Sequence, residues 1–298
     1  VDANAQNLSP QETAKQVEDL RPLLTAVLVY GAQPSASTQN MTAAGEICQA
    51  ISETKSCRVA IGGLHPSALP ERTFKETAVD FVIEGEEQLP LQYLTEKLKA
   101  NGTDYSKIPG LWYLDNKEIK HNSRSPLLTD LDRYLPTAAW ELLDMHNTRA
   151  HNWHCFGEDS RSPYAAIYTS LGCPYSCEFC CINVPFALQG ERHVIREKSP
   201  EAVVNEMEFL AKEYGIRNLK IIDELFVFQE DHYIKIVDEM IKRQLDLNIW
   251  AYARVDTVKP ENLEKMKEAG INWLALGIES GDQNVRKVSR KRIREDSI

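Results

Sequence analysis

Short apolar runs alternate with segments of helical periodicity along most of this sequence, and this alternation constrains the fold more than any other feature. In the first hundred residues the runs are 25–30, 57–61 and 78–83, and a glycine or a Glu-Gly pair follows each run. The segment 41–54 repeats apolar residues every four positions, as on one face of a helix. Strands that alternate with helices form parallel sheets, so residues 1–100 predict a doubly wound, Rossmann or flavodoxin-like α/β domain.

The same alternation resumes after residue 163. Repeated βα units are typical of a (β/α) barrel, whose active site lies at the carboxyl ends of the strands. Four apolar runs predict a partial barrel over residues 164–298. The runs and the helical segments between them are, in order, 165–170, 200–214, 218–222, 229–244, 248–253, 260–269 and 273–278.

Residues 101–163 form a connecting region with weaker periodicity. Residues 111–114 and 117–120 predict a β-hairpin with Asp115 and Asn116 in its tight turn, because both residue types tolerate positive φ. The stretch 123–143 is typical of a linker with a short helix. The sequence therefore divides into 1–100, 101–163 and 164–298.

His151, His154 and Cys155 gather near the end of the connecting region. They form either a metal site or a packed cluster that faces the domain junction or a substrate cavity. A tetrahedral metal site needs a fourth ligand, which nothing nearby supplies, so packing is the favoured interpretation.

Composition and charge narrow the classes of function. The 298 residues carry 34 Lys and Arg against 44 Asp and Glu, a formal charge of −10, and 43% are hydrophobic, which disfavours a disordered chain. The acidic balance argues against a nonspecific nucleic-acid binder. No apolar run is long enough to span a bilayer, and the first residues do not resemble a signal peptide. We expect a cytoplasmic protein whose partner is a small molecule, a peptide or another protein.

Four of the seven cysteines lie within nine residues of one another. Cys173, Cys177 and Cys180 follow an apolar run with the spacing CxxxCxxC, in a single loop. Structural zinc usually takes four ligands in two pairs, whereas three thiolates on a four-iron cluster leave one iron open for a substrate. The spacing favours the cluster over zinc. Cys181 follows Cys180 directly, and we interpret it as a packed thiol.

Charged and polar side chains stand at the ends of the later strands. Asp223 and Glu224 end one run, Arg254 the next, and Glu279 and Ser280 the last. Strand ends of a barrel meet at one face, and a guanidinium can bind a carboxylate through two hydrogen bonds. These residues predict a polar ring around the cysteine loop.

Three loops of the first domain also share an edge. Residues 31–37, 62–67 and 84–88 each follow a strand, and ligands of doubly wound sheets bind beyond the carboxyl ends of the strands. A single glycine often only ends a strand, but three loops with glycine at equivalent positions predict a ligand site.

The segment 173–180, with Phe179 before its last cysteine, resembles the signature of the radical S-adenosylmethionine (SAM) superfamily. The resemblance implies that Cys173, Cys177 and Cys180 hold a 4Fe-4S cluster. It also implies reductive cleavage of SAM at the open iron, with electrons from a donor such as flavodoxin or ferredoxin. The implied SAM contacts are the Phe179 backbone beside the adenine and the strand-end residues Asp223, Glu224, Arg254, Glu279 and Ser280.

The first domain resembles the cobalamin-binding domain that precedes many radical SAM cores. The resemblance rests on Gly62-Gly63-Leu64-His65-Pro66, Leu69-Pro70-Glu71 and residues 79–86. It implies that His65 lies in a segment that contacts the cofactor's nucleotide tail, and not that it ligates cobalt. The implied cobalamin contacts are Ser35, Ser37, Gly62, Gly63 and Gly85.

Relative to that family, the chain begins at what looks like the end of the second strand, residues 1–4, and stops after four of the usual six barrel strands. We therefore expect either a fragment of a longer protein, whose first strand and helix are absent and whose sheet lacks a central strand, or a chain in which another segment fills that gap. An unpaired internal edge would be a site of aggregation.

The combined resemblance implies a cobalamin-dependent radical SAM enzyme, and a methyltransferase acting at an unactivated carbon is the favoured activity. Two alternatives stay open. One keeps both cofactors but drives cyclisation or rearrangement, and the other is a noncatalytic cobalamin or metal-binding sensor protein, including one stabilised by zinc.

Overall fold

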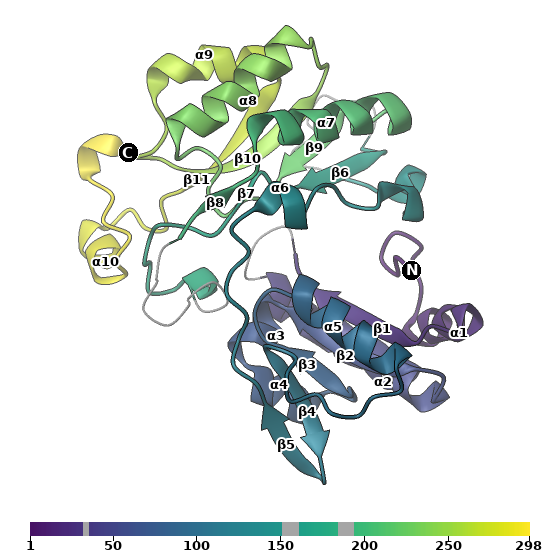
Figure 1. Ribbon diagram of the computed structural model, residues 1–298. Helices are drawn as coiled ribbons and strands as arrows, with labels where there is room; N and C mark the ends of the chain where they lie inside the picture. Colours follow the sequence, from purple (N-terminus) through teal and green to yellow (C-terminus); the bar gives the residue numbers. More distant parts are fainter. Residues whose placement is uncertain (32–35, 151–160, 184–193) are drawn as a thin grey trace. The chain divides into compact units, whose positions relative to one another are not determined.

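A computed structural model describes residues 1–31, 36–150, 161–183 and 194–298 (Figure 1). The chain divides into two compact units. The first comprises Val1–Leu128 with Cys181–Glu191, and the second comprises Thr129–Cys180 with Arg192–Ile298. In the described parts of the chain, no helix is both long enough and apolar enough to cross a membrane.

The first unit is built on one five-stranded sheet in the order β1-β2-β3-β4-β5. The strands β1, β2 and β3 run parallel, and the β4–β5 hairpin continues the sheet in antiparallel fashion. The elements are α1 (Pro10–Leu20), β1 (Leu24–Val29), α2 (Ala36–Thr54), β2 (Arg58–Gly63), α3 (Leu64–Ala68), α4 (Pro70–Glu76), β3 (Phe81–Ile83), α5 (Gln88–Lys99), β4 (Leu111–Asp115), β5 (Glu118–His121) and the 3-10 turn η4 (Cys181–Asn183).

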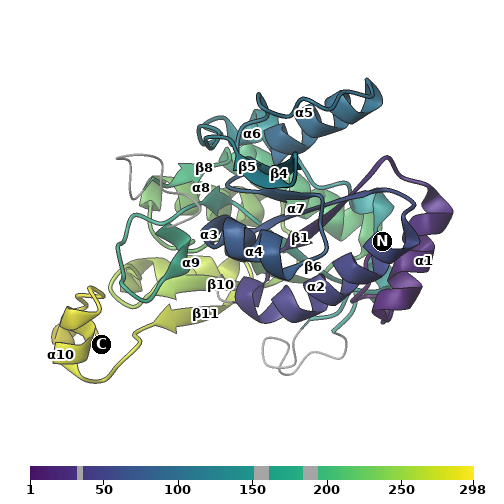
Figure 2. The same ribbon diagram turned by 90° about the horizontal axis from the view of Figure 1, so that it is seen from below.

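Helices cover both faces of this sheet, as a doubly wound domain requires. On β2 the alternate residues Val59 and Ile61 pack with α1, α2 and α4, whereas Ala60 packs on the opposite face with Leu94 of α5. Figure 2 shows α1, α2 and α4 together on one side. The prediction of parallel strands with helical crossovers is confirmed for β1 to β3.

The hairpin differs from the prediction in two respects. Its turn residues are Asn116 and Lys117, with φ of 49° and 69°, and Asp115 is the last residue of β4 paired with Glu118. Two consecutive positive φ values are those of the turn that matches the twist of paired strands, so the turn lies one residue later than expected. The hairpin was assigned to the connecting region, but β4 pairs with β3.

The opposite edge of the sheet is β1. Within the described residues no strand pairs with its outer side, and Leu28 on it is 50% exposed. Residues 3–7 form turns instead of the strand end expected at residues 1–4. Among the described residues β1 therefore forms one edge of the sheet, and β1 to β5 pair without the gap expected from a missing central strand.

Gly63, at the end of β2, packs too closely against the neighbouring strand to carry a side chain. Its φ is +120°, and a Cβ built on it would collide with the carbonyl of Val29 on the paired strand. We expect Gly63→Ala to lower the free energy of unfolding of this unit by about 3 kcal/mol, measured by denaturant titration.

Gly45→Ala is the matched control. Gly45 lies within α2, and its added Cβ would meet only Thr77 Cγ2 at 3.7 Å. We expect this variant to be more stable by about 0.5–1 kcal/mol, because alanine favours the helix over glycine. Equal destabilisation by both substitutions would contradict the steric argument.

The second unit carries a four-stranded parallel sheet in the order β11-β10-β9-β6, so consecutive strands are neighbours, as in a barrel. The predicted run 165–170 is divided between β6 and β7. The elements are α6 (Leu131–Tyr134), η1 (Trp140–Leu142), η2 (Met145–Asn147), β6 (Tyr164–Ile167), β7 (Ser170–Leu171), β8 (Arg196–Glu197), α7 (Pro200–Tyr214), β9 (Asn218–Ile221), α8 (Glu230–Lys242), β10 (Asn248–Arg254), α9 (Pro260–Glu268), β11 (Ile271–Gly277), α10 (Gln283–Val288) and η5 (Glu295–Ser297).

Helix α7 illustrates why these elements form where the sequence predicts them. The hydroxyl of Ser199 accepts a hydrogen bond from Ala202 N at the first turn, and Gly215 ends the helix with a left-handed φ of 64°. Val203, Met207 and Leu210 are fully buried. They join side chains of β6, β9 and β10 in one core, which leaves the opposite face of the sheet to polar and aromatic residues.

Candidate cofactor sites

The cysteine loop begins directly after β7 in the second unit. Gly172 precedes it with φ of +93°, and a Cβ there would collide with the carbonyl oxygen of Val194. At the other end of the loop, Cys180 N donates to Cys177 O at 3.1 Å, and Glu178 N donates to Ser289 O at 3.0 Å. The loop is therefore fixed at its entry by a glycine and along its length by backbone hydrogen bonds.

The three cysteines of the motif are free thiols. Cys177 is buried, and Cys173 and Cys180 are half-buried. Burial, with smaller contributions from Cys180, Glu224 and Cys177, raises the pKa of Cys173 to about 11. Formation of the Cys173 thiolate near neutral pH therefore requires a positive charge or a metal.

No group of three His, Cys, Asp or Glu side chains in the described residues has the geometry that holds a single metal ion. A four-iron cluster makes a different demand, because each thiolate binds its own iron and the sulfur atoms need not converge on one point. Three neighbouring thiols from one loop fit that demand. The donor set is all sulfur, as such a cluster requires.

Arg254, at the end of β10, lies beside the motif. Its Nη1 is 3.9 Å from Cys177 Sγ, and its guanidinium stacks on the ring of Tyr175 with 3.8 Å to the centroid. Two hydrogen bonds of 2.9 Å join it to Asp256, and Nη2 also donates to Lys291 O. Arg254 thus lies at the cysteine loop. Asp256 occupies the edge of its guanidinium that could bind a carboxylate through two hydrogen bonds.

Asp223 and Glu224 are both fully engaged by this loop region. Asp223 accepts hydrogen bonds from Thr169 N, Thr169 Oγ1 and Ser170 Oγ, at 2.5–2.7 Å, and burial raises its pKa. Glu224 accepts from Gly172 N at 2.9 Å, and burial raises its pKa to about 8. Both side chains hold the segment that leads into the cysteines.

The last predicted pair lies at the turn after β11. Glu279 has a φ of +72° and its carboxylate is 3.0 Å from Lys291 Nζ. Lys291 Nζ also lies 6.0 Å from the centroid of Phe179, which is itself 54% exposed. Ser280 accepts a hydrogen bond from Asp282 N. Lys291 therefore connects the Glu279 turn to the cysteine loop, a role that sequence analysis did not detect.

Sequence analysis also missed the face of the barrel sheet opposite the helices. Lys220 lies over Trp250 at 4.0 Å and over Tyr252 at 4.9 Å, and its Nζ donates to the Tyr252 hydroxyl at 3.2 Å. Burial lowers the pKa of Lys220 to about 8 and raises that of Tyr252 to about 12. The two-residue spacing of Trp250, Tyr252 and Arg254 on β10 was the available signal, because alternate residues share one face of a strand.

A cavity of about 410 Å³ adjoins the cysteine loop. One wall is the segment Pro174–Ser176, which lies between the first two cysteines. The charged groups in the other walls are four cations and one carboxylate, contributed by Arg254, Asp256, Arg290, Lys291 and Arg292. This cavity is suited to anionic groups.

In the first unit, hydrogen bonds join the loops at the carboxyl edge of β1, β2 and β3. The buried Ser37 hydroxyl donates to Val29 O and accepts from His65 N. Ser67 Oγ accepts from Gly85 N at 3.0 Å. The predicted convergence of the three loops is observed, but the Ser37 hydroxyl is already engaged within the protein.

The predicted glycines of this edge have different surroundings. A Cβ on Gly62 would overlap Glu87 Cγ, and Gly63 abuts Val29, so packing within the sheet accounts for both. Gly85 has a φ of +99° and more room, with Arg124 Cδ at 4.0 Å from its built Cβ. Ser35 lies outside the described residues, as do His151, His154 and Cys155.

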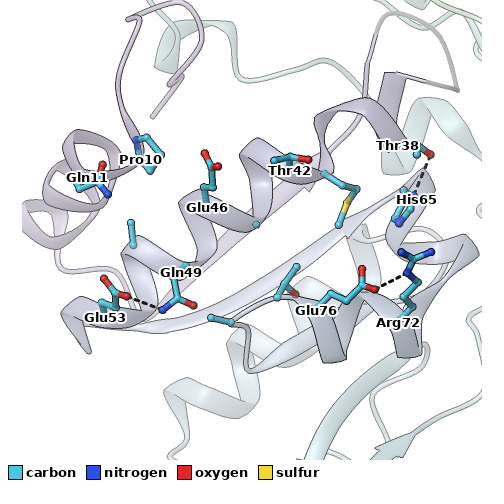
Figure 3. A pocket seen from close by; sticks show the side chains of 15 residues that line it. Pro10, Gln11, Thr38, Thr42, Glu46, Gln49, Glu53, His65, Arg72 and Glu76 are labelled. Atoms are coloured by element: carbon cyan, nitrogen blue, oxygen red, sulfur yellow. Dashed lines mark hydrogen bonds and ion pairs between the residues drawn. The ribbon is translucent and has the colours of Figure 1, made fainter.

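A groove of about 860 Å³ runs along α2 in the same unit (Figure 3). His65 stands at one end, where its Nδ1 is 3.0 Å from Thr38 Oγ1, and Glu53 stands at the other. Burial and the nearby Arg72 lower the pKa of His65. One ring nitrogen of His65 is thus hydrogen-bonded to Thr38.

Glu87 is a buried acid at this edge that sequence analysis did not single out. Both of its carboxylate oxygens accept from the Tyr30 hydroxyl, at 3.0 and 2.8 Å. Burial, with a smaller contribution from the nearby Glu86, raises its pKa to about 7. Its ordinary value is 4.5. Between these two pH values the folded protein therefore holds a proton that the unfolded chain has lost, so stability falls as pH rises.

We expect Glu87→Gln to remove this pH dependence. Near pH 4.5 the variant and the natural protein are expected to unfold with similar free energies, and by about pH 8 the variant is expected to be more stable by about 3 kcal/mol. Denaturant titrations across this range measure the difference. A difference that does not grow with pH would show that Glu87 is ionised in the folded state.

Comparison with known proteins relates both units to one group of enzymes. Residues 167–298 match the Radical SAM superfamily model. An uncharacterized methyltransferase of Pyrococcus horikoshii is 28% identical over 96% of this chain and 58% of its own length. The anaerobic magnesium-protoporphyrin IX monomethyl ester cyclase of Cereibacter sphaeroides is 26% identical over 95% of this chain and 44% of its own length.

A solved structure shares the fold across both units. The cobalamin-dependent SAM radical enzyme OxsB, with aqua-cobalamin and SAM bound, superimposes with a TM-score of 0.69 and covers 97% of this chain and 40% of its own, at 20% identity. This chain spans about half the length of the curated relatives that it matches. Residues 167–298 are therefore similar to the radical SAM superfamily, whose members use SAM and a 4Fe-4S cluster, and the chain shares the fold of the cobalamin-dependent enzyme OxsB.

Proposed function

We propose that the protein is a cobalamin-dependent radical SAM methyltransferase acting at an unactivated carbon. The observation that carries this proposal is the cysteine loop, which presents three thiols directly after the short strand β7, with a buried guanidinium 3.9 Å from one sulfur. When bound, the cluster supplies the electron that cleaves SAM reductively, and cobalamin supplies the methyl group.

In the second unit, we assign Cys173, Cys177 and Cys180 as the cluster ligands. Arg254 lies beside Cys177 and its positive charge attracts the SAM carboxylate, although Asp256 occupies its bidentate edge. Phe179, Glu279 and Ser280 are assigned as SAM contacts. Asp223 and Glu224 act as positioning residues, because their oxygens are bonded to the segment that leads into the loop.

In the first unit, we assign the carboxyl edge of β1, β2 and β3 to cobalamin. The contacts inferred from the resemblance are Ser35, Ser37, Gly62, Gly63 and Gly85. The convergence of the three loops supports this assignment, and Gly85 has the space for a close approach. Because the Ser37 hydroxyl is engaged by Val29 and His65, its contact with the cofactor is expected through the backbone.

A second candidate activity is cyclisation with the same cofactors. Similarity to the magnesium-protoporphyrin IX monomethyl ester cyclase of Cereibacter sphaeroides supports it, because that enzyme matches 95% of this chain at 26% identity. The substrate in either case is a small molecule or a peptide, and the reductant is a protein such as flavodoxin or ferredoxin. A sensor without catalytic activity is the outcome to exclude.

The test is metal and cofactor analysis of the intact protein, purified without oxygen and reconstituted with iron, sulfide and cobalamin. About four irons and one cobalamin per chain, with 5′-deoxyadenosine formed from SAM under reducing conditions, are expected. S-adenosylhomocysteine in addition would favour methyl transfer over cyclisation, because it is what remains when SAM gives up its methyl group. One zinc without iron, or no SAM cleavage, would overturn the proposal.

A further inference from the structure

The segment 286–294 departs from the acidic balance of the chain. Six of its nine residues are Arg or Lys, whereas the protein as a whole carries a formal charge of −10. Two of the six are buried and engaged within the unit, since Arg286 is bonded to Ser280 O and Lys291 to Glu279. The other four are Lys287, Arg290, Arg292 and Arg294, which are exposed. The segment therefore concentrates positive charge on the surface.

This segment lies against the cysteine loop. The Arg290 guanidinium pairs with the Glu178 carboxylate at 2.6 Å, and Glu178 N donates to Ser289 O at 3.0 Å. Arg290 and Arg292 line the same cavity as Pro174–Ser176, which lies between two cluster cysteines. The positive charge thus lies beside the loop that carries the predicted cluster ligands.

The surroundings of these cations match a small protein interface. In the described residues no carboxylate forms an ion pair with Lys287 or Arg292, and the neighbouring Val288 is 80% exposed. Phe179, on the cysteine loop itself, is 54% exposed. Apolar groups with charged residues around them are typical of a protein contact, and electron-transfer complexes use small, weak interfaces steered by charge.

We propose that Lys287, Arg290 and Arg292, here called the basic patch, dock an acidic one-electron donor protein of the flavodoxin class. This proposal rests on the proposed function, because it assumes a cluster in the adjacent loop. One electron leaves the donor's anionic flavin hydroquinone, which becomes the neutral semiquinone, and reduces the cluster by one electron. Docking at the patch shortens the path of that electron, which matters because the rate of electron transfer falls steeply with distance.

The test measures binding first, with oxidised flavodoxin as the probe and the intact reconstituted protein. The double variant Lys287→Glu/Arg292→Glu breaks no ion pair of the described structure and changes the net charge by four. Its matched control is Lys235→Glu/Lys267→Glu, which makes the same change of charge on the exposed surfaces of α8 and α9.

We expect the patch variant to raise the Kd for flavodoxin at least about tenfold at low salt, and the control to change it less than about twofold. The difference is expected to vanish near 0.5 M salt, because salt screens exposed charges. Flavodoxin-driven SAM cleavage should fall with binding. Lys287→Glu alone should also weaken binding and, because Lys287 does not line the cavity beside the cysteine loop, should leave cleavage driven by dithionite unchanged. Arg290→Gln provides a milder second variant if charge reversal disturbs the loop.

Unchanged binding by the patch variant, or equal weakening by the control, would overturn the docking site. Loss of dithionite-driven cleavage in Lys287→Glu would also overturn it, because the segment would then support the active site itself. Failure of the natural protein to cleave SAM with dithionite would instead count against the proposed function.

Discussion

Replacing Cys177 by alanine is expected to abolish cluster binding and, with it, reductive SAM cleavage. Cys177 is the buried thiol of the three and the one beside Arg254, so its loss removes the ligand least replaceable by solvent. Iron is expected to fall from about four per chain to below one. SAM cleavage under dithionite is expected to fall at least about a thousandfold, to background. Iron analysis and 5′-deoxyadenosine quantification measure both effects.

Cys181→Ala is the matched control for this variant. Cys181 follows Cys180 directly but was interpreted as a packed thiol, so this substitution is expected to retain the iron and the activity. If Cys181→Ala lost iron as Cys177→Ala does, the assignment of three ligands would be wrong. A retained cluster in Cys177→Ala would contradict the whole site.

Replacing Glu206 by alanine is expected to have the largest effect on folding. Glu206, on α7, is buried, and Lys198 Nζ lies 2.8 Å from its carboxylate. The same carboxylate accepts from Trp140 Nε1 and Thr137 Oγ1, both at 3.0 Å. Its removal leaves the Lys198 ammonium buried without its counter-ion and takes an acceptor away from Trp140 Nε1, Thr137 Oγ1 and Ala138 N. We expect a loss of about 3–5 kcal/mol in the free energy of unfolding.

Asp238→Ala is the comparison for this prediction. Asp238 pairs with Lys265 on the surface of the same unit, where both side chains are largely exposed. Exposed pairs contribute little, so we expect a loss below about 1 kcal/mol. Denaturant titration of both variants and the natural protein measures the difference. If both variants lost a similarly small amount of unfolding free energy, residues 137–140 would not be held by Glu206.

The sequence predicted the elements of both sheets because their signals are local. Helix α7 begins and ends where Ser199 and Gly215 indicate, since capping depends on residues next to the helix. The hairpin turn was placed one residue too early. Asp and Asn both tolerate positive φ, and the register that selects Asn116 and Lys117 is set by pairing across the strands.

The strand-end carboxylates could be listed from the sequence but their roles could not. The contact of Asp223 and Glu224 with SAM stays a prediction, whereas their hydrogen bonds to Thr169, Ser170 and Gly172 are observed. These partners are about fifty residues away in the chain. No spacing rule links such positions, because the contact exists only after β6 and β9 pair.

By itself, the sequence determined the alternation of strands and helices and the three candidate cluster ligands, because both depend on spacing within a single segment. Only the tertiary structure decided which charges are buried and with what partners: Arg254 with Asp256 beside Cys177, Lys198 with Glu206, and Lys220 against Trp250. The physical reason is that burial and pairing energies depend on distances between segments, which the fold alone sets.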